Sequence, residues 1–148
     1  MTAVKHPISL HRVVFTRASV MAVPNFDPTA PDLPVTLPEN NLNLIRVEAQ
    51  HNHFIGTMRT VINPTMDPKY PYSVDMECVA VLKADEELEA AEAEKGCMIT
   101  AHSVLYGAIR ETVAWLSGRQ PHGELLLGLS VLGGGQPAQE SPATASDQ

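Results

Sequence analysis

The sequence predicts an α+β fold: a four-stranded antiparallel sheet with a long helix and a short acidic helix packed on one face. Residues 8–83 contain four stretches rich in β-branched or alternating apolar residues, whereas residues 85–117 carry helix formers at helical spacing. Strands that all precede the helices favour an antiparallel sheet with the helices on one face. The 148 residues fit one domain, residues 1–132, followed by a disordered tail at residues 133–148, which lacks apolar periodicity.

The first predicted strand spans residues 8–23, which are rich in β-branched side chains and contain no glycine or proline. Strict alternation places Ile8 and Val14 on one face and Val13 and Phe15 on the other, so both faces are apolar. Such a strand is covered on both faces, and we expect another subunit to supply the second cover. Residues 24–41 contain five prolines and predict a long, stiff connection.

Three further strands follow this connection. Residues 42–49 and 53–62 predict a hairpin with a turn at residues 50–52, and the proline-rich residues 63–71 predict a loop. Residues 72–83 show the clearest alternation of apolar and polar side chains. Because Asp75 and Glu77 occupy its polar positions, we predict that they point away from the core, toward solvent or a partner.

Two helices are predicted after the strands. Residues 85–95 predict the short acidic helix, because they contain strong helix formers and their acids cluster near its start. Gly96 interrupts it, and residues 97–117 predict the long helix, which ends at Gly118. The apolar stripe of the long helix is Met98, Ala101, Leu105, Ala108, Ile109, Thr112 and Leu116. Residues 125–132 predict a short extended segment.

The composition narrows the class of partner. A formal net charge of −7 argues against nucleic-acid binding, which requires basic residues, and against anionic membrane surfaces. No apolar run approaches the roughly 20 residues that a membrane-spanning helix needs, and the first residues lack the apolar run of a signal peptide. Cys78 and Cys97 lack metal-binding spacing, which predicts free thiols in a reducing cytoplasm.

No recognised catalytic or phosphate-binding motif occurs in the sequence, so we expect no enzymatic activity, no cofactor and no metal. His51 and His53 lie at the predicted hairpin turn, where solvated histidines are more common than metal ligands. His102 lies beside the apolar stripe of the long helix, which favours a core or interface role over catalysis. The acidic helix is interpreted as a solvated face rather than a surface for a basic partner.

The order of the elements resembles the SecB family of export chaperones, in which a proline-rich loop follows the first strand and a long helix follows the fourth. The most specific stretch is SVLYGAIRETVAWLSGR at Ser103–Arg119, which is similar to the main helix of that family, with Arg110–Glu111 at its arginine–glutamate pair. The preceding ITAHSVLYG is also similar. RVVF at Arg12–Phe15 resembles the start of the family's first strand.

The resemblance implies a non-enzymatic holdase that uses no nucleotide and keeps unfolded polypeptides from folding or aggregating. It implies dimers formed through first strands and main helices, pairing into tetramers, and long grooves that bind extended apolar segments. We therefore predict a cytoplasmic homo-oligomer, a dimer or tetramer. The candidate peptide-binding or interface residues are Phe15, Val23, Phe26, Leu33, Phe54, Tyr70, Tyr72 and Trp115.

The sequence departs from the family where the export chaperone docks the SecA motor. Arg17 and Met21 occupy positions at which the family carries acids, while Asp75 retains an acid, so we expect weak or absent SecA binding. The tail also cannot supply the family's second helix. A general export factor, a chaperone dedicated to an antitoxin and a mobile-element protein are all compatible with these residues. The alternative is a structural or assembly subunit that binds no unfolded chain.

Overall fold

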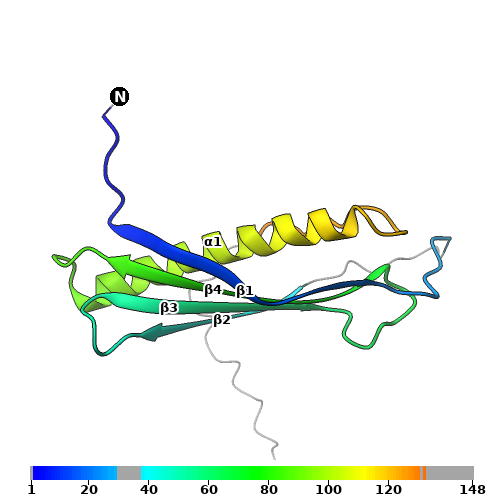
Figure 1. The fold of residues 1–148 in the computed structure, drawn as a ribbon, viewed down its shortest axis with the longest axis horizontal. Coiled ribbons are helices and arrows are strands. Elements are labelled where there is room, and N and C mark those ends of the chain that lie inside the picture. Colours follow the sequence, from blue (N-terminus) through cyan, green and yellow to red (C-terminus); the bar gives the residue numbers. More distant parts are fainter. Residues whose placement is uncertain (1, 30–37, 131, 133–148) are drawn as a thin grey trace, which may run out of the picture.

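A computed structural model describes residues 2–29, 38–130 and 132, and it confirms the α+β fold (Figure 1). The elements are β1 (Ile8–Ala22), β2 (Glu39–Arg46), β3 (His53–Ile62), β4 (Tyr72–Ala84) and α1 (Ala90–Ser117). The strands form one antiparallel sheet in the order β1-β4-β3-β2, and α1 packs along one face. Two predictions lie outside the described residues: the contact role of Leu33 and the disorder of residues 133–148.

The core lies between α1 and the face of the sheet that we call the helix-side face. In β4 every second residue from Tyr72 to Ala84 is buried, which confirms the predicted alternation. The residues between them, including Asp75 and Glu77, lie on the opposite face, which we call the outer face. Cys78 and Cys97 are both buried and free. Burial raises the pKa of the Cys97 thiol to about 11, so the thiol is protonated at neutral pH.

The prediction that β1 is apolar on both faces is wrong, because β1 contains two irregularities in its pairing with β4. The register shifts between Leu10 and Arg12 and again between Phe15 and Arg17. Each shift inserts one residue, and this changes which side chains share a face. Val13 and Phe15 therefore pair with helix-side residues of β4. The helix-side residues of β1 are all apolar: Ile8, Leu10, Val13, Phe15, Ala18, Val20 and Ala22.

The β2–β3 hairpin has a longer turn than predicted, spanning residues 47–52. Asn52 adopts a left-handed φ of 53° and is fully buried. Its backbone oxygen accepts from Ala84 N at 2.9 Å, and its side-chain amide donates to Asp85 O at 2.9 Å and Leu88 O at 3.3 Å. The amide thereby fixes the hairpin turn against the chain that leaves β4.

The prediction of a separate acidic helix at residues 85–95 is also wrong. Residues 86–87 form a turn held by the Asn52 amide, and α1 runs without interruption through Gly96. Gly96 packs against β1, where an added Cβ would lie 3.2 Å from Ile8 Cδ1. Tertiary packing thus overrides the low helix propensity of glycine. His102 and Tyr106 of α1 are buried, and the other seven buried residues of the helix recur at every fourth position beside them: Ala93, Cys97, Ala101, Leu105, Ile109, Val113 and Ser117.

Candidate polypeptide-binding surface

The helix-side face of β1 is only partly covered by α1. Ile8 and Val20, near the two ends of the strand, are buried, whereas Leu10 and Phe15 between them are 44% and 36% exposed. Ala18 is exposed as well. We call Leu10, Phe15 and Ala18 the β1 strip. Because β1 is an edge strand, the strip combines exposed apolar side chains with unpaired backbone groups, and this combination can receive another extended chain.

Three of the predicted contact residues gather where β1 ends and β4 begins. The His122 ring lies 5.0 Å from the Phe26 ring and 5.7 Å from the Tyr72 ring, measured between centroids. His122 Nε2 lies 3.0 Å from Val23 O. Val23 and Tyr72 are buried and belong to the core, so Phe26 is the more accessible member of this group. The sequence carried no signal that His122 joins these residues.

The other predicted contact residues are dispersed. Phe54 is buried under the guanidinium of Arg46, which lies 4.7 Å from its ring centroid. Tyr70 is half-buried in the loop before β4. Trp115 is 59% exposed on α1, and the Arg119 guanidinium lies 4.5 Å from its ring centroid. The structure therefore does not bring the seven candidates that it describes into one site, and the contact role stays a prediction for each of them.

The outer face neutralises its acids internally. Asp75 accepts from Arg17 Nη1 at 2.8 Å and from Arg59 Nε and Nη2 at 3.0 and 2.9 Å. These bonds, from Arg59 foremost, hold the pKa of the Asp75 carboxyl below its usual range. Glu77 Oε1 accepts from the Thr16 hydroxyl at 2.7 Å. Asp75 and Glu77, which the sequence predicts to face solvent or a partner, are thus both hydrogen-bonded by neighbouring side chains of the sheet.

A segment that the sequence pattern identified only as extended packs beside α1. We call residues 123–130 the C-terminal segment; it belongs to no strand. Arg110 Nε donates to Leu127 O at 2.8 Å, and the Tyr106 hydroxyl donates to Gly128 O at 2.6 Å. The donors are side chains of α1 and the acceptors are backbone carbonyls. In the sequence, this contact is indicated by the hydrogen-bonding side chains of Tyr106 and Arg110, which lie four residues apart on one flank of α1.

Solved structures with the same arrangement exist, although no family model and no curated protein sequence matches the chain. The SecB-like chaperone Rv1957 of Mycobacterium tuberculosis, in complex with a ChAD peptide from the antitoxin Rv1956 HigA1, aligns with a TM-score of 0.61. The sequences are 19% identical, and the alignment covers 84% of this chain and 91% of that chain. The chain has a SecB-like fold.

A second solved structure with this fold is a protein of unknown function from Streptococcus agalactiae. It aligns with a TM-score of 0.55 at 12% identity, and the alignment covers 82% of this chain and 97% of that chain. In both cases the alignment takes in most of each chain, so the similarity extends over the sheet and α1 together. The SecB-like fold predicted from the order of elements and from the stretch at Ser103–Arg119 is thereby confirmed.

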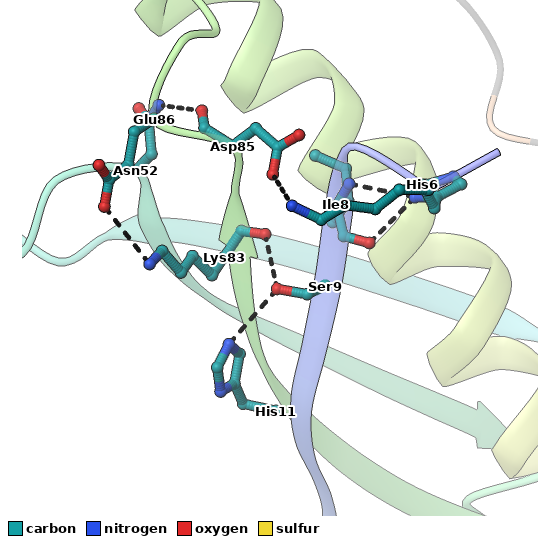
Figure 2. Close-up of polar contacts among 9 residues, drawn as sticks. His6, Ile8, Ser9, His11, Asn52, Lys83, Asp85 and Glu86 are labelled. Carbon is teal, nitrogen blue, oxygen red and sulfur yellow. Dashed lines mark hydrogen bonds and ion pairs between the residues drawn. The ribbon is translucent and has the colours of Figure 1, made fainter.

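The end of the molecule where β1 begins and β4 ends is polar (Figure 2). Lys5 Nζ lies 3.3 Å from Asp85 Oδ1, and Ser9 donates to Lys83 O at 3.3 Å. A depression of about 480 Å³ lies here and is lined by Lys5, Lys83, Asp85, Glu86 and Glu87. Its charges of both signs do not suit an apolar chain, so the apolar surfaces at β1 and beside α1 are the better candidates for binding a polypeptide.

Two further findings concern other classes of site. Within the described ranges, no three His, Cys, Asp or Glu side chains lie close enough together to hold a metal ion. Among the same residues, no helix combines the length and apolar character that a membrane crossing needs.

Proposed function

We propose that the protein is a non-enzymatic chaperone that holds unfolded or extended polypeptides. The observation that carries the proposal is the β1 strip: a SecB-like fold leaves apolar side chains uncovered on the longest edge strand of its sheet. Each apolar side chain that a client buries fully there contributes about 1.5–3 kcal/mol. Backbone pairing along the edge of β1 adds affinity without sequence specificity.

The β1 strip is compatible with a chaperone dedicated to one client at least as well as with a general export chaperone. The structurally similar Mycobacterium tuberculosis chaperone was solved with a peptide from an antitoxin. The outer face also lacks a free acidic patch, because Arg17 and Arg59 neutralise Asp75. A basic surface of SecA would meet these arginines, so we propose weak or absent SecA binding. The protein acts in the cytoplasm as a dimer or tetramer in this proposal.

The test is suppression of aggregation for several unrelated unfolded clients. We expect the wild type to suppress aggregation and Leu10→Ser to lose most of this effect, since Leu10 lies in the strip. Ile45→Ser is the matched control, because Ile45 is 55% exposed on β2, away from the strip. Equal loss in both variants, or no suppression by the wild type, would contradict the holdase proposal.

A second candidate function uses the same strip. An uncovered apolar edge also suits permanent contact between subunits, so a structural or assembly role without clients is the alternative. Binding of a fluorescent unfolded polypeptide separates the two. A chaperone at micromolar concentration binds the polypeptide and raises its fluorescence anisotropy. An assembly subunit stays oligomeric and leaves the anisotropy of the polypeptide unchanged.

A further inference from the structure

One side chain occupies the last part of the open edge of β1. Gln120 lies in the turn that follows α1, at the end of the molecule where β1 also ends (Figure 1). Its Nε2 donates to Val20 O at 2.8 Å, and its Oε1 accepts from Ala22 N at 3.0 Å. An added strand would bond to these same backbone groups, because β1 is the outermost strand of the sheet. A single amide, which offers both a donor and an acceptor, therefore takes the place of part of a further strand.

The end of α1 holds this amide in place. The Gln120 backbone N–H donates to Ser117 O at 2.9 Å, and Gln120 Nε2 also lies 3.3 Å from Leu116 O. Both acceptors belong to the last turn of the helix. His122 Nε2 lies 3.0 Å from Val23 O, so the chain that leaves α1 continues to contact the backbone just past the end of β1. The edge of the sheet is therefore occupied from Val20 onward by side chains from one turn.

The exposed side chains of β1 end at the same place as its open backbone. All three residues of the β1 strip precede Val20, and the last of them, Ala18, is exposed, whereas Val20 is buried. No register shift separates Ala18 from Val20, so both residues present their backbone groups to the same side of the strand. A chain that pairs with β1 thus finds apolar side chains up to Ala18 and an occupied edge beyond it.

We propose that Gln120 determines how far along β1 an extended client pairs: the client bonds to the edge as far as Ala18, and the amide excludes it from Val20 and Ala22. The proposal rests on the proposed binding of clients at β1. A client gains little from backbone groups that are already bonded, because it must break one hydrogen bond for each one that it makes. Gln120 is in this sense a positioning residue, which fixes one boundary of the client-binding edge.

Hydrogen exchange of the Ala22 amide tests whether Gln120 protects the edge. Gln120→Ala removes the acceptor of this amide, so we expect its exchange to become about tenfold faster than in the wild type. Gln120→Glu retains a side-chain oxygen that accepts from Ala22 N, so the amide stays protected. The matched control is Gln50→Ala, at an exposed position of the β2–β3 turn, which leaves the exchange of Ala22 unchanged.

Two peptides of different length test the boundary itself. Both are fluorescein-labelled, alternate valine with threonine and carry flanking lysines, and binding is followed by anisotropy. The shorter peptide, of about 8 residues, fits the edge before Val20, whereas the longer one, of about 14 residues, extends past it. The readout is the ratio of the two affinities. We expect this ratio to favour the longer peptide about fivefold more in Gln120→Ala than in the wild type, because two further backbone groups become available. Gln50→Ala leaves the ratio at its wild-type value.

The outcomes separate the boundary from the proposed function. An unchanged ratio of affinities in a folded Gln120→Ala variant would overturn the proposal, and so would an unchanged exchange rate of the Ala22 amide. If the wild type binds the shorter peptide in either case, client binding at β1 stands and only the boundary at Gln120 fails. If neither the wild type nor any variant binds either peptide, client binding at β1 fails, and the boundary fails with it.

Discussion

The two edges of the sheet, β1 and β2, differ in length, regularity and side chains. β1 has 15 residues, two register shifts and an uncovered apolar strip. β2 has 8 residues, pairs with β3 without a shift, and carries asparagine at positions 40, 41 and 43. Short, polar edge strands discourage pairing with other chains, whereas long apolar ones invite it. By length and side chains, β1 is therefore better suited than β2 to pairing with another chain.

The largest expected effect is on assembly. Phe15→Asp places a charge in the β1 strip, and burying an unpaired charge between subunits is unfavourable. A permanent subunit contact at the strip predicts that the wild type sediments as a dimer or tetramer of the 16.0 kDa chain and the variant as a monomer. A client-binding strip, as proposed above, predicts that the variant keeps the oligomer of the wild type and loses client binding. The control is Ile45→Asp on β2, which should leave the oligomer intact. A monomeric wild type at micromolar concentration would remove the distinction between the edges.

Deletions within β1 test the irregular pairing. Thr16 is the residue inserted at the second shift, so its deletion removes that shift and keeps every other side chain on its face. Deletion of Val14 either moves the residues before it to the opposite face or puts Thr16 on the helix-side face in the place of Phe15. We expect deletion of Val14 to cost about 2–3 kcal/mol of unfolding free energy, the burial of one large apolar side chain. Denaturant unfolding of the two variants checks the order, and equal losses would contradict it.

A smaller effect is expected where β2 is held to β3. The buried Thr60 hydroxyl donates to Asn40 Oδ1 at 2.7 Å, and Asn40→Ala leaves it without this acceptor. We expect a loss of about 1–2 kcal/mol in unfolding free energy. Asn43→Ala, at an exposed position, should change stability by less than about 0.5 kcal/mol. Thr60→Val in the Asn40→Ala background should recover part of the loss.

The smallest effect concerns the outer face of β1 and its neighbours. The pKa of Asp75 is lowered in the folded state, chiefly by Arg59. Its contribution is therefore fully present above the unfolded pKa of about 3.9 and is lost as pH falls through the folded pKa. Asp75→Asn should flatten the decline in stability below about pH 4, by at most about 1 kcal/mol for a partly exposed pair. Thermal melts from pH 7 to pH 2 measure this difference, and parallel curves would contradict it.

Elements whose local pattern reflects their burial, such as β4, agree with the structure. The predictions fail where a tertiary contact decides the outcome, as in β1 and at the start of α1. The alternation of β4 was visible because one of its faces is buried along its whole length. The register shifts in β1 could not be seen in the sequence, because an inserted residue does not change the local pattern of a β-branched run. The local sequence predicts an interruption of the helix at Gly96, because the packing of Gly96 against Ile8 depends on a residue far away in the chain.

The candidate site was the least predictable part. Phe15 and Trp115 are exposed as a contact role requires, but Phe54, Tyr72 and Val23 build the core. Large apolar residues look alike in sequence whether they face a core or a partner. The flank of α1 that binds the C-terminal segment consists of polar residues, so a search for apolar contact residues could not find it.

The contacts of Asn52 have a consequence for the order in which the elements fold. Its amide joins the hairpin turn to the carbonyls of Asp85 and Leu88, next to the start of α1. Helix nucleation is unfavourable in isolation, whereas a hairpin closes within microseconds. Closure of the turn therefore supplies a template on which α1 begins. Pairing of Ile8 with Ala84 must close a far longer loop, so we expect β1 to join the sheet last. Until β1 pairs, the sheet ends at β4, and the backbone groups of β4 that pair with β1 in the folded protein are open to another chain.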